Sequence, residues 1–379
     1  MADPIPLARP EIGAREEELV LEVLRSGALS LGPMLERFER ALAEWLGTED
    51  AVAVSSGTAA LHLGVRALGW GRGDEVVTSP LSFVASANCL LYEGATPVFC
   101  DVDPVTLNID PDAARAALSE RTAGLLPVDI FGYPADLGAL SSLAAKRGLE
   151  LLEDACEALG AVDADGVALG ARGIPCAFAF YANKQLTTGE GGALIPADAA
   201  MASRLRSERN QGRASDMERI EHERLGFNYR LTDLAAALGV AQLERADEIL
   251  ARRARVAEMY RERLAELEGV IPPCEDRGSE RRSWFVYVAQ LPQRADREAV
   301  IAGLARAGIA SKPYLPCIHL LPFYRRRFGF EGGEFPVAER FAERSLGLPF
   351  FTSMAEEQVE RVTGALAEVL RQPARTAAE

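Results

Sequence analysis

A single lysine stands close to the end of an apolar run of the chain. Lys184 lies in FAFYANKQLTTGEGGAL (residues 178–194), where its backbone follows a strand-like segment. Burial at the end of a strand strips water from an amine and favours its neutral, nucleophilic form. The glycines that follow, Gly189, Gly191 and Gly192, leave room for a flat molecule beside that amine. The alternatives are a surface lysine in a loop and a simple hairpin turn.

A carboxylate precedes this lysine, at the end of another apolar run. Asp154 closes the strand-like part of LLEDACEALG (residues 151–160). A buried carboxylate is costly unless a cation or a metal ion pairs with it, and a protonated pyridine ring is one such cation. A helix N-cap for the residues that follow explains an aspartate at this position equally well.

Two further motifs can supply parts of a cofactor site. In SSGTAAL (residues 55–61), Gly57 and Thr58 follow a strand and open a helix, where free N–H groups and the helix dipole favour a phosphate. In PLSFVASAN (residues 80–88), Phe83 offers a ring that can stack on a flat cofactor. Taken singly, a plain strand-to-helix turn and a core phenylalanine explain these motifs better.

The motifs gain meaning from their order along the chain. A phosphate-binding turn, then a carboxylate, then an amine are the parts that pyridoxal phosphate requires: an anion pocket, an acid partner for the ring nitrogen and a lysine for a Schiff base. A nicotinamide-dependent dehydrogenase is disfavoured, because no GxGxxG motif follows the first strand.

Alternating strand-like and helix-like segments position these residues over the first two-thirds of the chain. This alternation predicts an α/β fold with a mainly parallel sheet flanked by helices, in which ligands bind at the carboxyl ends of the strands. The expected strands are AVAVSSG, DEVVTSP, TPVFCDVD, AGLLPVDI, LELLED, PCAFAFY and GALIPA.

The pattern changes from about residue 232. TDLAAALGVAQLERADEILARRARVAEMYRERLAEL is predicted to form one long helical stretch, and the strand SWFVYVAQL and further helices follow it. This organisation predicts a large cofactor-binding α/β domain, residues 1–240, and a smaller C-terminal α+β domain, residues 241–379.

Charge and composition exclude several classes of function. The formal net charge is −15 and no basic stripe occurs, so nucleic acids and acidic membrane surfaces are not expected partners. The six cysteines form no CxxC pair, which is typical of reduced thiols, and no metal site is expected. The first residues lack a signal-peptide pattern, and no apolar run approaches the ~18 residues of a membrane span, so we expect a cytoplasmic protein.

Motifs in a fixed order resemble the DegT/StrS-type sugar aminotransferases, which are fold-type I pyridoxal phosphate enzymes. The resemblance extends over about residues 5–370 and implies that fold, that cofactor and a homodimer with shared active sites. It rests on AVSSGTAALHLGVRALG, GDEVVTSPLSFVASAN, LLEDACEALGA, FYANKQLTTGEGGAL, LGFNYRLTDLAAALGVAQLERADEI, GIASKPYLPCIHLLPFY and LGLPFF.

The resemblance also implies roles for single residues. The resemblance implies that Lys184 and Asp154 are the catalytic residues. In addition to binding the cofactor, Lys184 is implied to transfer a proton. The implied cofactor contacts are Gly57 and Thr58 on the phosphate, Phe83 on the ring face, Asp154 on the ring nitrogen, Glu157 near the 3-oxygen, Lys184 in the Schiff base and Asn228 on the phosphate of the neighbouring subunit.

Three positions depart from the family pattern. Ala179 stands where the family often has Ser, Tyr181 where it often has His, and Glu157 where Gln is common. A hydroxyl group that contacts the phosphate can therefore be missing at Ala179. Glu157, if it lies near the cofactor oxygen, must be protonated or turned toward solvent.

For the substrates, the resemblance implies glutamate or glutamine as amino donor and a nucleotide-linked keto sugar as acceptor. We expect amination at C4 of a 4-keto-6-deoxyhexose for surface polysaccharide, with transfer to C3 as a close alternative. Surface solvation explains any single cation better than diphosphate binding, and a structural role explains His319 equally well. The residues expected to contact substrate are Tyr181, Arg213, Arg230, Lys312, Tyr314 and His319.

Two other functions stay open. A related branch of the family removes a sugar hydroxyl as a dehydratase, but it carries His in place of the lysine, so Lys184 argues against it. A non-enzymatic binding or regulatory protein is the least expected function, because both Lys184 and Asp154 are present.

Overall fold

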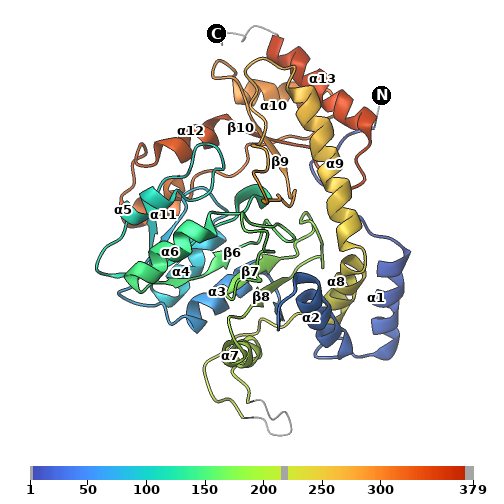
Figure 1. Ribbon diagram of the computed structural model, residues 1–379. Helices are drawn as coiled ribbons and strands as arrows, with labels where there is room; N and C mark the ends of the chain where they lie inside the picture. Colours follow the sequence, from blue (N-terminus) through green and yellow to red (C-terminus); the bar gives the residue numbers. More distant parts are fainter. Residues whose placement is uncertain (1–2, 215–220, 372–379) are drawn as a thin grey trace.

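Figure 1 shows the computed structural model of the chain, which describes residues 3–214 and 221–371. A central sheet carries helices on both faces. A smaller unit lies at the end of the molecule that carries the last helix (Figure 1). Among the described residues, no helix combines the length and the apolar character that crossing a membrane requires.

The central sheet consists of two four-stranded parts, in the orders β1-β8-β7-β6 and β3-β2-β4-β5. The parts are continuous, because β5 and β6 are pieces of one stretch whose Leu152 and Asp154 N–H groups donate to Leu125 and Pro127 on the neighbouring stretch. Among these strands only the β1–β8 and β8–β7 pairs are antiparallel, which confirms the mainly parallel sheet. The strands are β1 (Val52–Val54), β2 (Glu75–Thr78), β3 (Thr96–Phe99), β4 (Thr122–Leu126), β5 (Glu150–Leu151), β6 (Glu153–Asp154), β7 (Cys176–Ala179) and β8 (Gly192–Ile195).

Side chains of the sheet alternate between two buried apolar layers. Phe178 and Ile195 belong to the layer under α1, α2 and α8, whereas Ala177 and Leu194 belong to the layer under α3 and α4. Strands covered on both faces must be apolar throughout, which is the pattern in the sequence. The helices of this region are α1 (Ala14–Ser26), α2 (Pro33–Leu46), α3 (Gly57–Ala67), α4 (Ala85–Glu93), α5 (Pro111–Ala116), η1 (Ile130–Gly132), α6 (Leu137–Arg147), α7 (Ala199–Arg209) and α8 (Asp233–Leu243).

The single long helix expected from residue 232 is wrong in one respect, because the structure divides it into α8 and α9 (Ala246–Leu264). The break falls at Arg245, whose φ of −131° and ψ of 23° are not helical. Its guanidinium group pairs with Glu11 and Glu16 near the start of the chain, at 2.8 Å from each carboxylate. These partners are distant in sequence, so local helix propensity does not reveal the break.

The smaller unit is an antiparallel pair, β9 and β10, with its own apolar core under α9, α10 and α13. Two segments cross the boundary expected at residue 240. Ile5 bridges to Ile309 and packs in the C-terminal core, whereas Tyr314 and Ile318 pack against the large unit. The elements of this part are β9 (Tyr287–Gln290), α10 (Arg297–Arg306), η2 (Ile318–Leu320), α11 (Pro322–Phe328), α12 (Pro336–Arg344), β10 (Ser345–Leu348) and α13 (Glu356–Arg371).

Candidate active site

A cavity of about 730 Å³ lies where the carboxyl ends of the central strands meet the segment after α10. It is the point at which an open α/β sheet offers its ligand site. Most of the residues expected from the sequence line it. These are Gly57, Thr58, Phe83, Asp154, Glu157, Tyr181, Lys184, Lys312 and Tyr314.

The start of α3 forms one wall of this cavity. The side chain of Ser56 accepts a hydrogen bond from the N–H of Ala59, and its carbonyl accepts from that of Ala60. Among the described contacts, the N–H groups of Gly57 and Thr58 have no acceptor and are available to an anion. A Cβ at Gly57 would lie 2.7 Å from the Cβ of Ala179, so only glycine allows this close approach of helix and strand.

Asp154 forms the floor of the cavity and is only 3% exposed. Its Oδ2 accepts a hydrogen bond from Ser86 Oγ at 2.6 Å, and its Oδ1 accepts from the N–H of Cys156 at 3.2 Å. No helix follows in residues 155–160, so the N-cap alternative does not apply. The carboxylate is thus held rigid and faces a space in which a cationic ring can lie.

Lys184 is a cavity residue, and the surface-lysine alternative is excluded. Its side chain is 12% exposed, and Nζ lies 3.7 Å from Glu157 Oε1. The same ammonium group lies 3.9 Å from the centroid of the Phe285 ring. The amine is therefore held between a carboxylate and an aromatic face.

Glu157 does not turn toward solvent, although its charge departs from the family pattern. It is 7% exposed, and its Oε2 accepts a hydrogen bond of 3.0 Å from the N–H of Phe131. Phe131 and Gly132 have positive φ values of 54° and 85°, a strained turn that aims this N–H at the carboxylate. Burial raises the pKa of Glu157, and the charge of Lys184 partly opposes that rise.

Phe83 and Tyr181 form exposed aromatic surfaces on the cavity. Phe83 is 59% exposed and Tyr181 is 50% exposed, and both line this cavity. An apolar ring left open to solvent inside a cavity is what a flat ligand would cover.

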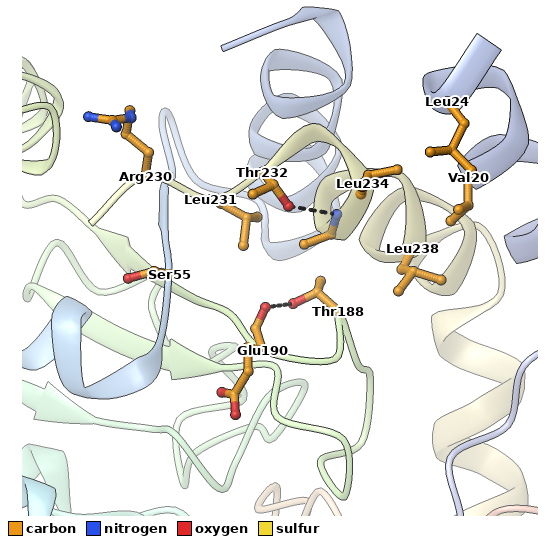
Figure 2. A pocket seen from close by; sticks show the side chains of 11 residues that line it. Val20, Leu24, Ser55, Thr188, Glu190, Arg230, Leu231, Thr232, Leu234 and Leu238 are labelled. Atoms are coloured by element: carbon orange, nitrogen blue, oxygen red, sulfur yellow. Dashed lines mark hydrogen bonds between the residues drawn. The ribbon is translucent and has the colours of Figure 1, made fainter. Parts of the chain in front are cut away.

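Arg230 lies elsewhere, at a second hollow of about 470 Å³ that shares Glu190 with the first. Figure 2 shows Arg230 at one end of this hollow, with Val20 and Leu24 at the other. The Arg230 guanidinium donates to Asn210 Oδ1 at 3.0 Å. Asn228, two residues before Arg230, is exposed and does not line the cofactor cavity of its own chain.

His319 lies outside the cavity and is fully buried. Its Nε2 lies 3.1 Å from Glu339 Oε1, and its ring packs edge-on against Phe335. Burial lowers the pKa of this imidazole, although Glu339 opposes that effect. His319, Glu334 and Glu339 could in principle share a metal ion, but both carboxylates already accept N–H groups of the loop between residues 331 and 335. The arrangement favours the structural alternative for His319.

Sequence reasoning missed two residues that act at the site. Ser86, which holds Asp154, lies three positions after Phe83 at the start of α4, so helical spacing could have found it. Phe285 comes from the segment before β9, and no local signal connects it with Lys184.

The residues present fit pyridoxal phosphate. The open start of α3 offers N–H groups to a phosphate, and the glycine at position 57 lets it approach the backbone. A buried carboxylate at Asp154 suits a protonated ring nitrogen, the exposed face of Phe83 suits a flat ring, and Lys184 supplies the amine.

Comparison with known proteins supports the same conclusion. The spore coat polysaccharide biosynthesis protein SpsC of Bacillus subtilis (strain 168) is 37% identical over 97% of each chain. GDP-perosamine synthase of Caulobacter vibrioides is 36% identical over 97% of this chain and 98% of that protein. The solved structure of S. venezuelae DesV in complex with a ketimine intermediate superposes with a TM-score of 0.92, 34% identity, and coverage of 98% of this chain and 100% of the other.

The family model of the DegT/DnrJ/EryC1/StrS aminotransferases matches residues 10–367, nearly the whole chain. This match confirms the expectation from the sequence motifs, and with it the aminotransferase activity and pyridoxal phosphate as the cofactor. The chain belongs to the DegT/DnrJ/EryC1/StrS aminotransferase family.

Proposed function

We propose that this aminotransferase moves an amino group from glutamate or glutamine to C4 of a 4-keto-6-deoxyhexose linked to a nucleoside diphosphate. The observation that carries the proposal is the single cavity that joins the start of α3, the buried carboxylate of Asp154 and the amine of Lys184. The family and the relatives named above support a sugar aminotransferase of polysaccharide or sugar biosynthesis. GDP-perosamine synthase, at 36% identity, supports a nucleotide-linked acceptor.

Each residue of the cavity has a task in this reaction. When bound, pyridoxal phosphate supplies an electron sink that lets the C–H bond beside the transferred nitrogen break. Asp154 holds a proton on the ring nitrogen, since a buried carboxylate is most stable beside a cation. Lys184 attaches the cofactor and then moves a proton at the substrate carbon, and Phe83 covers the ring. The N–H groups of Gly57 and Thr58 hold the phosphate.

The acceptor's diphosphate requires positive charge in a chain that carries a net charge of −15. Lys184 and Lys312 are the basic residues of this chain that line the cavity in the described structure. Lys312 is exposed, and its Nζ lies 5.3 Å from the ring centroid of Tyr314. We assign Lys312 to the diphosphate, and Tyr314 and Tyr181 to the sugar. C3 of the same sugar is the alternative position for the amino group.

A homodimer completes this proposal. The hollow in Figure 2 has apolar walls from α1 and α8, which include Leu24 at 52% exposure. A second copy of the chain on this face would cover them. Asn228 and Arg230, which lie outside the cofactor cavity of their own chain, would then serve the cavity of the partner subunit.

The test is the visible absorption spectrum of the protein with pyridoxal phosphate, measured beside Lys184→Ala. We expect a violet-absorbing band that requires Lys184 and bleaches when glutamate or glutamine is added. A panel of nucleotide-linked 3-keto and 4-keto sugars should then restore the band, and the sugar that restores it fastest identifies the acceptor. A band that is identical in Lys184→Ala and indifferent to both donors would contradict the proposal. Release of a sugar hydroxyl without amination would replace it by the dehydratase alternative.

A further inference from the structure

Lys184 must exist in two states if the proposed function holds. It would be attached to the cofactor before the donor arrives and again after the acceptor has received the amino group, and its amine would be free while the amino group resides on the cofactor. A long side chain with a free ammonium has many rotamers, and a free choice among them would slow the reattachment of the lysine to the cofactor. The structure contains a place where this free ammonium already lies.

This position is formed by the carboxylate of Glu157 and the aromatic ring of Phe285, which come from distant parts of the chain. Glu157 Oε1 lies 3.7 Å from Lys184 Nζ, and the ring centroid of Phe285 lies 3.9 Å from it. Both contacts are largely shielded from water, since Glu157 is 7% exposed and Phe285 is 2% exposed. Attraction of an ammonium to a carboxylate and to a ring face is stronger in such a setting than at the surface.

Glu157 is itself fixed from two directions. Its Oε2 is held by the N–H of Phe131, and its backbone carbonyl accepts a hydrogen bond of 2.7 Å from Gln185 Nε2. Gln185 is the residue directly after Lys184, so the carboxylate and the lysine are tied to one another through the backbone as well. A carboxylate that only filled space would not need the strained turn at Phe131.

We propose that Glu157 and the ring of Phe285 form a holding site for the ammonium group of Lys184 whenever this lysine is detached from the cofactor. The inference rests on the proposed function and adds a positioning role for both residues. It also explains why a glutamate replaces the common glutamine of the family, because only a charged oxygen attracts the ammonium strongly.

The composition of the chain makes the test specific. Lys146, Lys184 and Lys312 are the only lysines of the sequence, and Lys146 and Lys312 are exposed. The cofactor-free protein is treated with trinitrobenzenesulfonate near neutral pH, and the modification rate of each lysine is followed by peptide mass spectrometry. The two exposed lysines serve as internal references in every sample.

We expect Glu157→Gln to raise the modification rate of Lys184 by about tenfold or more relative to the reference lysines, because the charged contact that holds the ammonium in this shielded position is lost. Phe285→Leu should act in the same direction by a smaller factor. Glu190→Gln is the matched control, since Glu190 lines the same cavity without a described contact to Lys184, and it should leave the ratio unchanged. An unchanged ratio in both Glu157→Gln and Phe285→Leu would overturn the proposal.

A second measurement separates this inference from the proposed function. In cofactor-loaded protein Lys184 should resist modification, and after addition of glutamate it should become reactive, faster in Glu157→Gln than in the unaltered chain. If the cofactor never protects Lys184 from modification, the proposed function is contradicted, while the result obtained with the cofactor-free protein remains valid. Protection and release at equal rates in both proteins would instead contradict the holding site alone.

Discussion

Asp129 and Glu153 are two fully buried acidic neighbours, and Asp129 Oδ2 and both carboxyl oxygens of Glu153 have no hydrogen-bond partner among the described residues. Glu153 precedes Asp154 on β6, so the two side chains point to opposite faces of the sheet. Glu153 is registered with Cys176, and the charge of Asp163, which pairs with Arg172, also raises the pKa of Glu153. Burial raises the pKa of both carboxyls, that of Glu153 to about 7, so the pair holds a proton in the folded protein.

This pair predicts a pH-dependent stability. The folded pKa of Glu153 lies above its unfolded value of 4.5, so its contribution is present below pH 4.5 and is lost as the pH rises through about 7. The side chain of Glu153→Gln cannot ionise, so the variant does not suffer this loss. The difference in unfolding free energy between the variant and the unaltered chain should therefore increase by roughly 1–3 kcal/mol, in favour of the variant, from pH 5 to pH 8. Urea unfolding at both pH values measures this difference. A difference in unfolding free energy that stays constant between these pH values would contradict the raised pKa of Glu153.

Asp154→Asn tests the partner of the ring nitrogen. Ser86 can still donate a hydrogen bond to the amide oxygen, so the fold should be retained. The cofactor should still attach to Lys184, while the rate of amino transfer should fall by about a hundredfold or more, because a preorganised charge is lost. Single-turnover bleaching by glutamate measures this rate. A rate within twofold of the unaltered chain would remove Asp154 from the chemistry.

Ala179→Ser tests the missing phosphate hydroxyl. Ala179 lines the cavity beside Gly57, and a serine there adds a hydroxyl where the phosphate is expected. One added hydrogen bond contributes about 1 kcal/mol, so the cofactor should bind roughly fivefold more tightly. Gly57→Ala is the opposite case, since its Cβ would lie 3.0 Å from Cys156 Sγ and even closer to Ala179. Equilibrium titration with pyridoxal phosphate should show the two variants shifting in opposite directions.

Leu24→Glu tests the second copy of the chain. Leu24 is 52% exposed at the edge of the hollow in Figure 2, so a charge there costs little in a monomer and much in a buried interface. Light scattering after gel filtration should give a dimer for the unaltered chain and a lower mass for Leu24→Glu. Val105→Glu is the control at another exposed apolar position, at 45% exposure, and should keep the dimer mass.

His319→Asn distinguishes a structural histidine from a substrate contact. The change removes the hydrogen bond to Glu339 inside a buried aromatic cluster, so the melting temperature should fall by several degrees. The KM for the keto sugar should not change, because His319 does not line the cavity. A raised KM with an unaltered melting temperature would return His319 to the substrate site.

The sequence was sufficient for the parts of the site that follow strands. Asp154 and Lys184 each end an apolar run, and parallel strands bring such ends to one edge of the sheet. Contacts made by distant segments could not be predicted in this way. Phe285 meets Lys184 only after the C-terminal unit docks, and the break before α9 depends on pairing of Arg245 with the first helix. Asn228 and Arg230 do not line the described cofactor cavity of their own chain, so a role for them depends on the proposed dimer.

The N-terminal segment has a consequence for motion. Ile5 is anchored in the C-terminal core, and Leu7 accepts a hydrogen bond from the N–H of Phe350, while α1, a few residues later, packs on α8 of the large unit. The two units are therefore connected through this segment, through α9 and through the segment of Tyr314 and Ile318. Several connections restrict a hinge between the units to a small rotation, so the gap between Lys184 and Tyr314 should keep nearly the same width whether the cavity is empty or full.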